Sequence, residues 1–311
     1  MNEYRLTHPE SENYCLLSSG FGLKRYQNAA GWIDYWLGDH LIFSPRKNHY
    51  TTVSFPEKLH SHEYYELLIP RKGDVGFVAD NQYISPSPGT LIVFHPNCIH
   101  TGRLLSDSNY ERYVLLFDAE AFNLFGENLS PLSFLYNDAV CVELPPNMVD
   151  TLDQELQTIT AILSDEYADS ALLAYSHISR LLCLVNRHAT ISHRAVQTIP
   201  HNILKIKQYI DEHYLLLNTT TEVSEHFYYR REHVSRLFKE YFNTNLSDYL
   251  TSLKVIHSQK MLREGESVTN ACFQSGFRNM STFLSAFRKH TNMNPSAFRK
   301  ISIPSDFRNK C

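Results

Sequence analysis

Two segments near the end of this 311-residue chain are similar to each other, and this repeat constrains the fold more than any other feature of the sequence. The segments cover residues 223–242 and 272–291, and they align at an offset of 48 residues that becomes 49 after one extra residue in the turn. Each segment has two stretches with apolar residues at helical spacing on either side of a break, which predicts a helix, a turn and a second helix. The repeat therefore predicts an all-helical C-terminal region with two helix-turn-helix units.

The second helix of each unit carries short polar and basic side chains outside its apolar stripe. A helix that is packed on one side in this way can enter the major groove of DNA, where Arg reads guanine edges and Lys neutralises phosphate. The alternative is a helical interaction module whose basic residues are only a solvated face. The candidate DNA contacts are Arg230, Arg231, Glu232, Ser235, Arg236 and Lys239 in the first unit, and Arg278, Asn279, Ser281, Thr282, Ser285, Arg288 and Lys289 in the second.

The segment between the units, residues 245–264, predicts one long helix with Tyr249 and Leu253 on its buried side. Such a helix would hold the two units at a fixed separation, so that they enter successive major grooves about 34 Å apart on one face of DNA. Gly276 lies in the second turn, where a tight reversal favours a positive φ. The sequence Thr-Thr-Thr-Glu at 219–222 predicts a capping box at the start of the first unit.

The charge of the chain is divided unevenly along its length. The net charge is −4, but residues 201–311 hold 16 basic and 10 acidic residues, whereas residues 1–200 hold 13 and 23. A basic C-terminal part is typical of a separate nucleic-acid-binding domain, although two ordinary soluble domains can differ in this way by chance. The predicted organisation is a first domain at 1–147, helices that form a possible dimerisation element at 148–187, a linker at 188–200, a helical domain at 201–300 and a tail at 301–311.

Residues 40 to about 120 have the pattern of a β-sandwich or barrel. Short runs of β-branched and aromatic residues are separated by Pro, Gly, Asp and Asn, and Asp80-Asn81 predicts a hairpin turn. From about residue 147 the apolar period changes to that of two helices, the second with Leu173 and Ile178 in its stripe. The predicted strands are 51–55, 62–69, 75–80, 81–85, 90–95 and 113–118.

A group of histidines lies in this strand region. His60, His62 and Glu66 are all even-numbered and would share one face of a continuous strand, and His100 follows later in the chain. Three imidazoles and one carboxylate are a donor set for a divalent metal. We interpret these four residues first as effector contacts or structural histidines, with a metal site as the alternative, and we expect no obligatory cofactor.

The C-terminal stretch resembles the DNA-binding domain of the AraC/XylS family of regulators over residues 201–300. The similarity includes VSRLFKEYFNTNLSDYLTSLKV at 234–255, Gly276-Phe277 and FRKHTNMNPSAFRK at 287–300. It implies seven helices, with helices near 230–241 and 280–290 as the DNA readers. Two departures concern the DNA contacts: Arg230-Arg231 stands where the family usually has Ser-Pro, and Ser285 stands at a position that is often basic, so the second reading helix is expected to contact DNA differently or more weakly.

The same resemblance implies a cupin-like β-barrel before the helical domain, so the expected fold class is α+β. His60, His62 and Glu66 are similar to the cupin motif HxHxxxE, although His95 and Asn97 stand where a cupin enzyme motif would have Pro and Gly. In AraC-like sensors the barrel commonly binds a small effector, often without metal. The partners that the resemblance implies are double-stranded DNA, a small-molecule effector, a second copy of the chain in a homodimer, and RNA polymerase.

Several classes of protein are disfavoured by composition. The polar first residues contain no apolar core of a secretory signal, and no run of residues approaches the ~18 apolar residues that span a bilayer. The six cysteines have no CxxC spacing, which argues against a zinc finger and a disulfide framework and suits the cytoplasm. The leading hypothesis is a non-enzymatic, sequence-specific transcription regulator, with activation as the expected mode of control. The rival hypothesis is a metal-dependent cupin enzyme fused to a DNA-binding domain.

Overall fold

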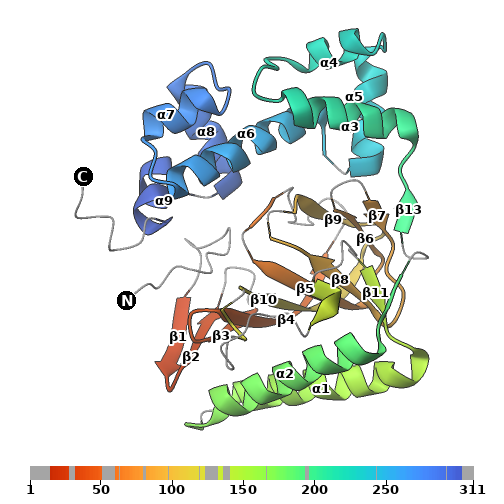
Figure 1. The fold of residues 1–311 in the computed structure, drawn as a ribbon, viewed down its shortest axis with the longest axis vertical. Helices are drawn as coiled ribbons and strands as arrows, with labels where there is room; N and C mark the ends of the chain where they lie inside the picture. Colours follow the sequence, from red (N-terminus) through yellow and green to blue (C-terminus); the bar gives the residue numbers. More distant parts are fainter. Residues whose placement is uncertain are drawn as a thin grey trace.

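The structure is a computed structural model in which the chain forms four layers. Figure 1 shows helices α1 and α2 below two β-sheets and the remaining helices above them. None of the helices in the described part of the chain is both long and apolar enough to span a bilayer. The described residues are 15–27, 32–50, 60–62, 64–79, 82–96, 98–118, 120–122, 132–135, 141–165, 167–192, 196–242, 244–291 and 293–302.

The larger sheet has nine antiparallel strands in the described residues, and its central strands are apolar on both faces. Along β5, for example, Leu67 and Ile69 belong to the core against α1 and α2, while Leu68 belongs to the core between the sheets. The strand order is β1 (Cys15–Gly20), β2 (Leu23–Gln27), β3 (Ile33–Leu37), β4 (Leu41–Tyr50), β10 (Ser108–Phe117), β5 (Tyr65–Lys72), β8 (Thr90–Phe94), β11 (Cys141–Glu143) and β12 (Thr190–Ile191).

The smaller sheet has four described strands and separates the larger sheet from the C-terminal helices. Its strand order is β13 (Val196–Thr198), β7 (Gln82–Ile84), β6 (Val75–Ala79) and β9 (His100–Leu104). Phe77 and Leu104 pack into the core between the sheets, whereas Val78 belongs to the core of the C-terminal helices. This alternation follows from the two-residue period of a strand, and it makes the small sheet the contact layer between the two halves of the chain.

Helices α1 (Pro146–Ser164) and α2 (Ser170–His188) cover the outer face of the larger sheet. Leu156, Ile159, Ile178 and Val185 are fully buried in that core. Between β10 and β11 the structure also describes a single 3-10 turn, η2 (Ser133–Leu135).

The described part of the C-terminal half contains seven helices, and two separate cores hold them together. One core surrounds α3 (His201–His213), α4 (Thr220–His226) and α5 (Arg231–Phe242), and the other surrounds α7 (Val268–Gln274), α8 (Met280–Thr291) and α9 (Pro295–Ser302). The long helix α6 (Leu246–Arg263) contributes Leu253 to the first core and Leu262 to the second. Both predicted helix-turn-helix units and the helix between them are therefore present.

The α+β fold class is confirmed, and the differences from the sequence prediction are local. Strands β1 to β3 precede the predicted strand region, and Leu173 is 45% exposed on α2 instead of buried in its stripe. Residues 188–200, predicted as a linker, include β12 and β13, which add to β11 and β7 because those strands leave unpaired edges. The predicted strand 51–55 and turn 80–81 lie outside the described residues, as do 303–311 of the predicted tail.

Candidate nucleic-acid interface and histidine cluster

The first helix-turn-helix unit consists of α4, a short turn and α5. The predicted capping box is present, with the Glu222 carboxylate accepting from the Thr219 backbone N–H at 3.0 Å. In the turn, Tyr228 has a φ of 56° and is 96% exposed. Val234 and Phe238 anchor α5 in the core, so the opposite side of this helix faces outward.

The candidate DNA contacts of the first unit lie on that outward side. Arg230, Arg231, Glu232, Arg236 and Lys239 are exposed, and Ser235 is half-buried. The guanidinium Nη1 of Arg236 lies 3.4 Å from a carboxylate oxygen of Glu240, and both side chains are more than half exposed. Such an exposed pair is weak and leaves Arg236 able to change partners.

The second unit, formed by α7 and α8, also presents its candidates to solvent. All seven residues predicted there are exposed, namely Arg278, Asn279, Ser281, Thr282, Ser285, Arg288 and Lys289. Gly276 has the positive φ expected of the turn, at 81°, and the carbonyl oxygen of Leu215 lies only 2.5 Å from where a Cβ would be. The Asn279 side chain accepts from the Thr282 backbone N–H at 2.8 Å, so this residue also caps α8.

The basic side chains of the second unit are more engaged within the protein than those of the first. Arg278 donates to the side-chain oxygen of Asn218 at 2.7 Å, and Arg288 donates to that of Asn294 at 2.6 Å. Lys289 lies 3.1 Å from a carboxylate oxygen of Asp248. Like the Arg236–Glu240 pair of the first unit, these are contacts between exposed side chains.

Lys254 is a buried residue that sequence reasoning missed. Its ammonium group donates to the carbonyl oxygens of Leu217 and Gly276, both at 2.7 Å. These carbonyls precede the first unit and lie in the turn of the second, so one side chain of α6 links the two units. Burial lowers the pKa of Lys254, the charge of Glu222 raises it, and the charge of Arg278 lowers it further. An unbroken helical pattern gave no signal for this role, because both acceptors are backbone atoms.

A second missed feature is the contact between strand β9 and the first reading helix. The Arg103 guanidinium donates to the backbone carbonyl of Glu240 in the last turn of α5 at 2.8 Å. A cation at this end of a helix also interacts favourably with the helix dipole. Val78, on the neighbouring strand β6, is buried in the core of the first unit, and Ile99 packs against that core.

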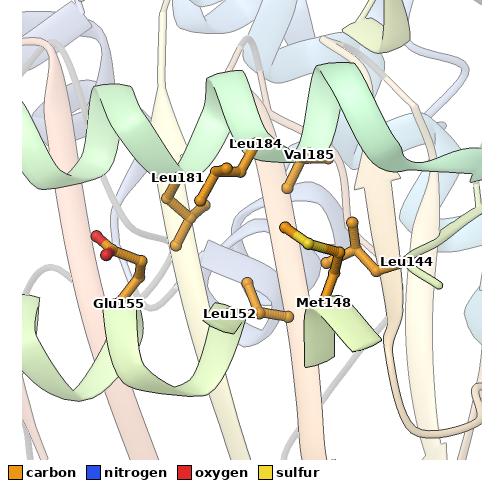
Figure 2. Close-up of a pocket in the computed structure, with 7 residues that line it drawn as sticks. All are labelled: Leu144, Met148, Leu152, Glu155, Leu181, Leu184 and Val185. Carbon is orange, nitrogen blue, oxygen red and sulfur yellow. The ribbon is translucent and has the colours of Figure 1, made fainter. Parts of the chain in front are cut away.

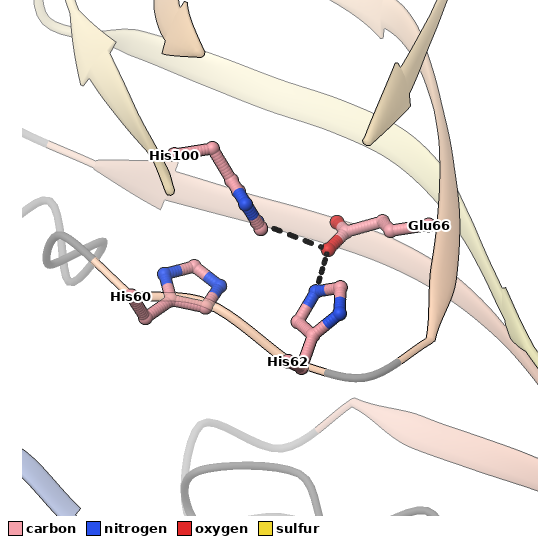
Figure 3. Close-up of side chains that lie close together, drawn as sticks. All are labelled: His60, His62, Glu66 and His100. Carbon is pink, nitrogen blue, oxygen red and sulfur yellow. Dashed lines mark hydrogen bonds and ion pairs between the residues drawn. The ribbon is translucent and has the colours of Figure 1, made fainter. Parts of the chain in front are cut away.

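The four predicted residues His60, His62, Glu66 and His100 converge between the two sheets (Figure 3). Each offers a ligand atom, and these atoms all lie within 4.8 Å of one another. His62, Glu66 and His100 are buried, and His60 is half-buried. His60 and His62 precede β5, so they do not share a strand face with Glu66 as the parity argument assumed. Instead, His60 pairs with His100 through two backbone hydrogen bonds of 3.0 Å.

Glu66 is the centre of this cluster. One of its carboxylate oxygens lies 2.9 Å from Nε2 of His62 and 3.4 Å from Nε2 of His100. Burial raises the pKa of Glu66, but the side-chain contacts and electrostatic interactions with His100 and His62 outweigh burial and hold the pKa well below its usual value. The phenyl ring of Phe94 stacks on His100 with ring centroids 4.0 Å apart.

A small pocket lies elsewhere, between α1 and α2 (Figure 2). Its lining is apolar except for Glu155, which pairs with Arg180 and with His177. Its volume is about 10 Å³, close to the space of one water molecule. This pocket is too small for an organic effector.

Comparisons with known proteins agree with both halves of the structure. The model of the AraC-like ligand binding domain matches residues 40–182, and the model of a helix-turn-helix domain matches residues 223–301. Two curated relatives extend over most of the chain. The melibiose operon regulatory protein of Escherichia coli K12 is 24% identical over 255 residues, covering 78% of this chain and 83% of that protein. The probable transcriptional regulator LumQ of Photobacterium leiognathi is 22% identical over 253 residues, covering 80% and 94%.

Among solved structures, that of ToxT from Vibrio cholerae O395 is 14% identical and covers 83% of this chain and 97% of that one, with a TM-score of 0.33. The two family models together account for the β domain with its following helices and for both helix-turn-helix units. This chain is a transcription regulator of the AraC family, with an N-terminal ligand-binding domain and a C-terminal helix-turn-helix DNA-binding domain.

Proposed function

We propose that α5 and α8 read two successive major grooves, and that an effector in the β domain controls DNA binding by changing the restraint on α5. The observation that carries this proposal is the contact of β9 with the last turn of α5. The candidate contacts on α5 and α8 point to solvent, and α6 joins the two units as one continuous helix.

The two reading helices have unequal roles in this proposal. On α5, Arg231 and Arg236 contact bases and Lys239 contacts phosphate, because Arg has the donor pattern that fits guanine whereas Lys acts as a point charge. On α8, Arg288 and Lys289 must first leave their partners Asn294 and Asp248. We therefore assign more of the binding free energy to the first unit.

The effector acts through the two faces of β9. His100 points into the cluster between the sheets, while Arg103 and Ile99 face the C-terminal helices. A shift of this short strand on one face thus displaces atoms that contact α5 on the other. The effector then changes DNA affinity by favouring one arrangement of the first unit over another, without any catalysed reaction.

The test is a DNA-binding measurement with full-length protein on a duplex selected from random sequences. We expect Arg236→Ala to lower affinity for that duplex about 5- to 150-fold and to relax the base preference at one position, which corresponds to the ~1–3 kcal/mol of a bidentate base contact. Lys239→Ala should lower affinity for all duplexes alike and make the salt dependence shallower by about one unit of slope.

Lys260→Ala is the matched control, since Lys260 is an exposed lysine of α6 outside both reading helices. Unchanged affinity in Arg236→Ala and Lys239→Ala at every salt concentration contradicts the assignment of α5. A loss of equal size in Lys260→Ala means that only the general positive charge of the domain matters.

The remaining partners belong to the same proposal. We propose that the chain works in the cytoplasm as a homodimer that contacts RNA polymerase and activates transcription. Support for the dimer comes from Leu172 and Leu173 of α2, which are 75% and 45% exposed. The rival, a cupin enzyme with a DNA-binding tail, requires turnover of a substrate at the histidine cluster, and the burial of His62, Glu66 and His100 disfavours it.

A further inference from the structure

We propose that His60, His62, Glu66 and His100 bind a divalent first-row transition-metal ion such as Zn²⁺, and that this ion is the effector that acts on α5. The first half of this statement stands on the cluster alone. The second half rests on the proposed function.

The donor set suits such an ion. Three imidazole nitrogens and one carboxylate oxygen are ligands that Zn²⁺, Fe²⁺, Mn²⁺, Co²⁺ and Ni²⁺ accept, whereas Ca²⁺ and Mg²⁺ require mostly oxygen. The four residues come from the segment before β5, from β5 itself and from β9, so they surround one point between the two sheets. Figure 3 shows the four side chains directed toward that point.

Two of the histidines are held by backbone carbonyls in the way that metal ligands usually are. Nδ1 of His62 lies 3.1 Å from the carbonyl oxygen of Tyr64, and Nδ1 of His100 lies 3.0 Å from that of Cys98. A carbonyl oxygen can only accept, so each Nδ1 carries the hydrogen. This leaves Nε2 as the atom of each ring that faces Glu66, with its lone pair available to an ion. Outer hydrogen bonds of this kind fix the tautomer and orientation of histidine ligands.

The same directions place two imidazole nitrogens against one buried carboxylate oxygen of Glu66, with Nε2 of His62 at 2.9 Å and Nε2 of His100 at 3.4 Å. Nε2 of His100 is buried, and its 3.4 Å contact with Glu66 does not have the geometry of a hydrogen bond. One divalent ion between these atoms would accept the lone pairs of both Nε2 atoms and balance the charge of the buried Glu66 carboxylate.

Binding requires a small contraction of the cluster, and this contraction reaches β9. Ligand atoms about 2.1 Å from one ion are at most about 4.2 Å apart. The ligand atoms here are spread over as much as 4.8 Å, so the most distant pair must approach. His100 begins β9 and is joined to His60 by backbone hydrogen bonds. Movement of His100 toward the ion therefore shifts the strand whose Arg103 contacts α5.

Metal binding is tested on full-length protein stripped with a chelator. Co²⁺ is added while visible absorption is recorded, and Zn²⁺ affinity is measured by competition. We expect one ion per chain for the wild type, and affinity lowered more than about 100-fold in Glu66→Gln and His62→Gln, since loss of an outer hydrogen bond already costs 10- to 100-fold.

The control variant is His177→Gln, because His177 also pairs with a buried glutamate, Glu155, but lies on α2 far from the cluster in sequence. It should bind the ion like the wild type. Thermal unfolding with and without Zn²⁺ shows which variants are folded, and only folded variants are compared. The metal site is overturned by absence of binding to the wild type, or by equal binding in Glu66→Gln, His62→Gln and the wild type.

The effector role is tested by DNA affinity at fixed salt with and without Zn²⁺. We expect a change of at least about 5-fold in the wild type and in His177→Gln, and none in Glu66→Gln. If the ion binds but DNA affinity does not change, the effector role is wrong while the metal site and DNA binding both stand. If the wild type binds no DNA in either state, the proposed function fails and the metal site stands alone.

Discussion

Gly276 and Tyr228 occupy equivalent positions in the turns of the two units, and both have a left-handed backbone. Their φ values are 81° and 56°. Glycine adopts this conformation without strain, whereas a tyrosine costs about 1–2 kcal/mol there. The space around the two residues explains why one turn has a glycine and the other a tyrosine. A Cβ at Gly276 would meet the carbonyl oxygen of Leu215, whereas Tyr228 is 96% exposed and has room for its side chain.

This difference makes a prediction for Gly276→Ala. We expect the variant to lose about 1–3 kcal/mol of unfolding free energy, because the new methyl group forces both a strained φ and a backbone displacement. Chemical denaturation followed by circular dichroism measures the loss. Gly265→Ala is the matched control: Gly265 also has a positive φ, at 93°, but nothing lies within 4 Å of a Cβ there. Equal losses in the two variants would mean that the close approach to Leu215 has no effect.

The thirteen candidate DNA contacts show what single residues of a sequence can reveal. A stripe of buried residues three and four positions apart leaves the other side of the helix exposed, and the exposure of Arg231, Arg236 and Arg288 agrees with that reasoning. Sequence periodicity does not show that the Arg288 guanidinium donates to the Asn294 side chain, or that the Asn279 side chain caps α8. Asn279 and Asn294 lie just before α8 and α9, so these contacts depend on the residue at which each helix begins.

At the scale of elements, α6 does more than separate the two units. This helix is buried on several sides. Its Lys254 contacts the backbone carbonyl of Leu217, and its His257 contacts the side chain of Tyr214. The hydroxyl of Tyr214, at the end of α3, lies 2.8 Å from Nδ1 of His257. Burial and the nearby Asp211 raise the pKa of Tyr214, so the phenol stays protonated and donates to a neutral imidazole.

His257 should make the stability of the helical domain depend on pH. Burial lowers the pKa of His257 below its usual 6.5, Lys260 lowers it further, and Glu264 raises it. A lowered pKa in the folded state means that the unfolded state binds the proton more readily. The contribution of His257 is therefore fully present above pH 6.5 and is lost as the pH falls through the lowered pKa.

We expect the unfolding free energy of the wild type to fall more between pH 7.5 and pH 5.5 than that of His257→Gln. Urea denaturation at several pH values measures the two slopes. His188→Gln, at an exposed residue of α2, is the control and should keep the wild-type slope. Identical slopes in the wild type and His257→Gln would show that burial of this imidazole is unimportant.

At the scale of the whole molecule, the small sheet joins the two domains. Its inner face contributes to the core between the sheets, and its outer face contributes Val78 to the core of the first DNA-binding unit. Among the described residues of α7, α8 and α9, none belongs to that core. Signals from the β domain should therefore reach α5 first and α8 only through α6.

Arg103→Ala should uncouple the two domains. We expect this variant to bind Zn²⁺ as tightly as the wild type but to lose most of the dependence of DNA affinity on Zn²⁺, because the side chain that links β9 to α5 is gone. Parallel metal titrations and DNA-binding curves measure the two properties. Lys47→Ala, at an exposed lysine of β4, is the control and should keep the coupling. Full coupling in Arg103→Ala would show that the signal takes another path.

The sequence alone determined the all-helical C-terminal domain, its two units and the β-rich nature of the first domain, because helical and strand periodicities depend on residues only a few positions apart. It also singled out the four residues of the histidine cluster. Only the tertiary structure decided that a backbone bridge joins His60 to His100, and that Arg103 meets Glu240 at a separation of 137 residues. Contacts between residues so far apart in the sequence depend on how whole sheets and helices pack, so they cannot be predicted from periodicities that relate residues only a few positions apart.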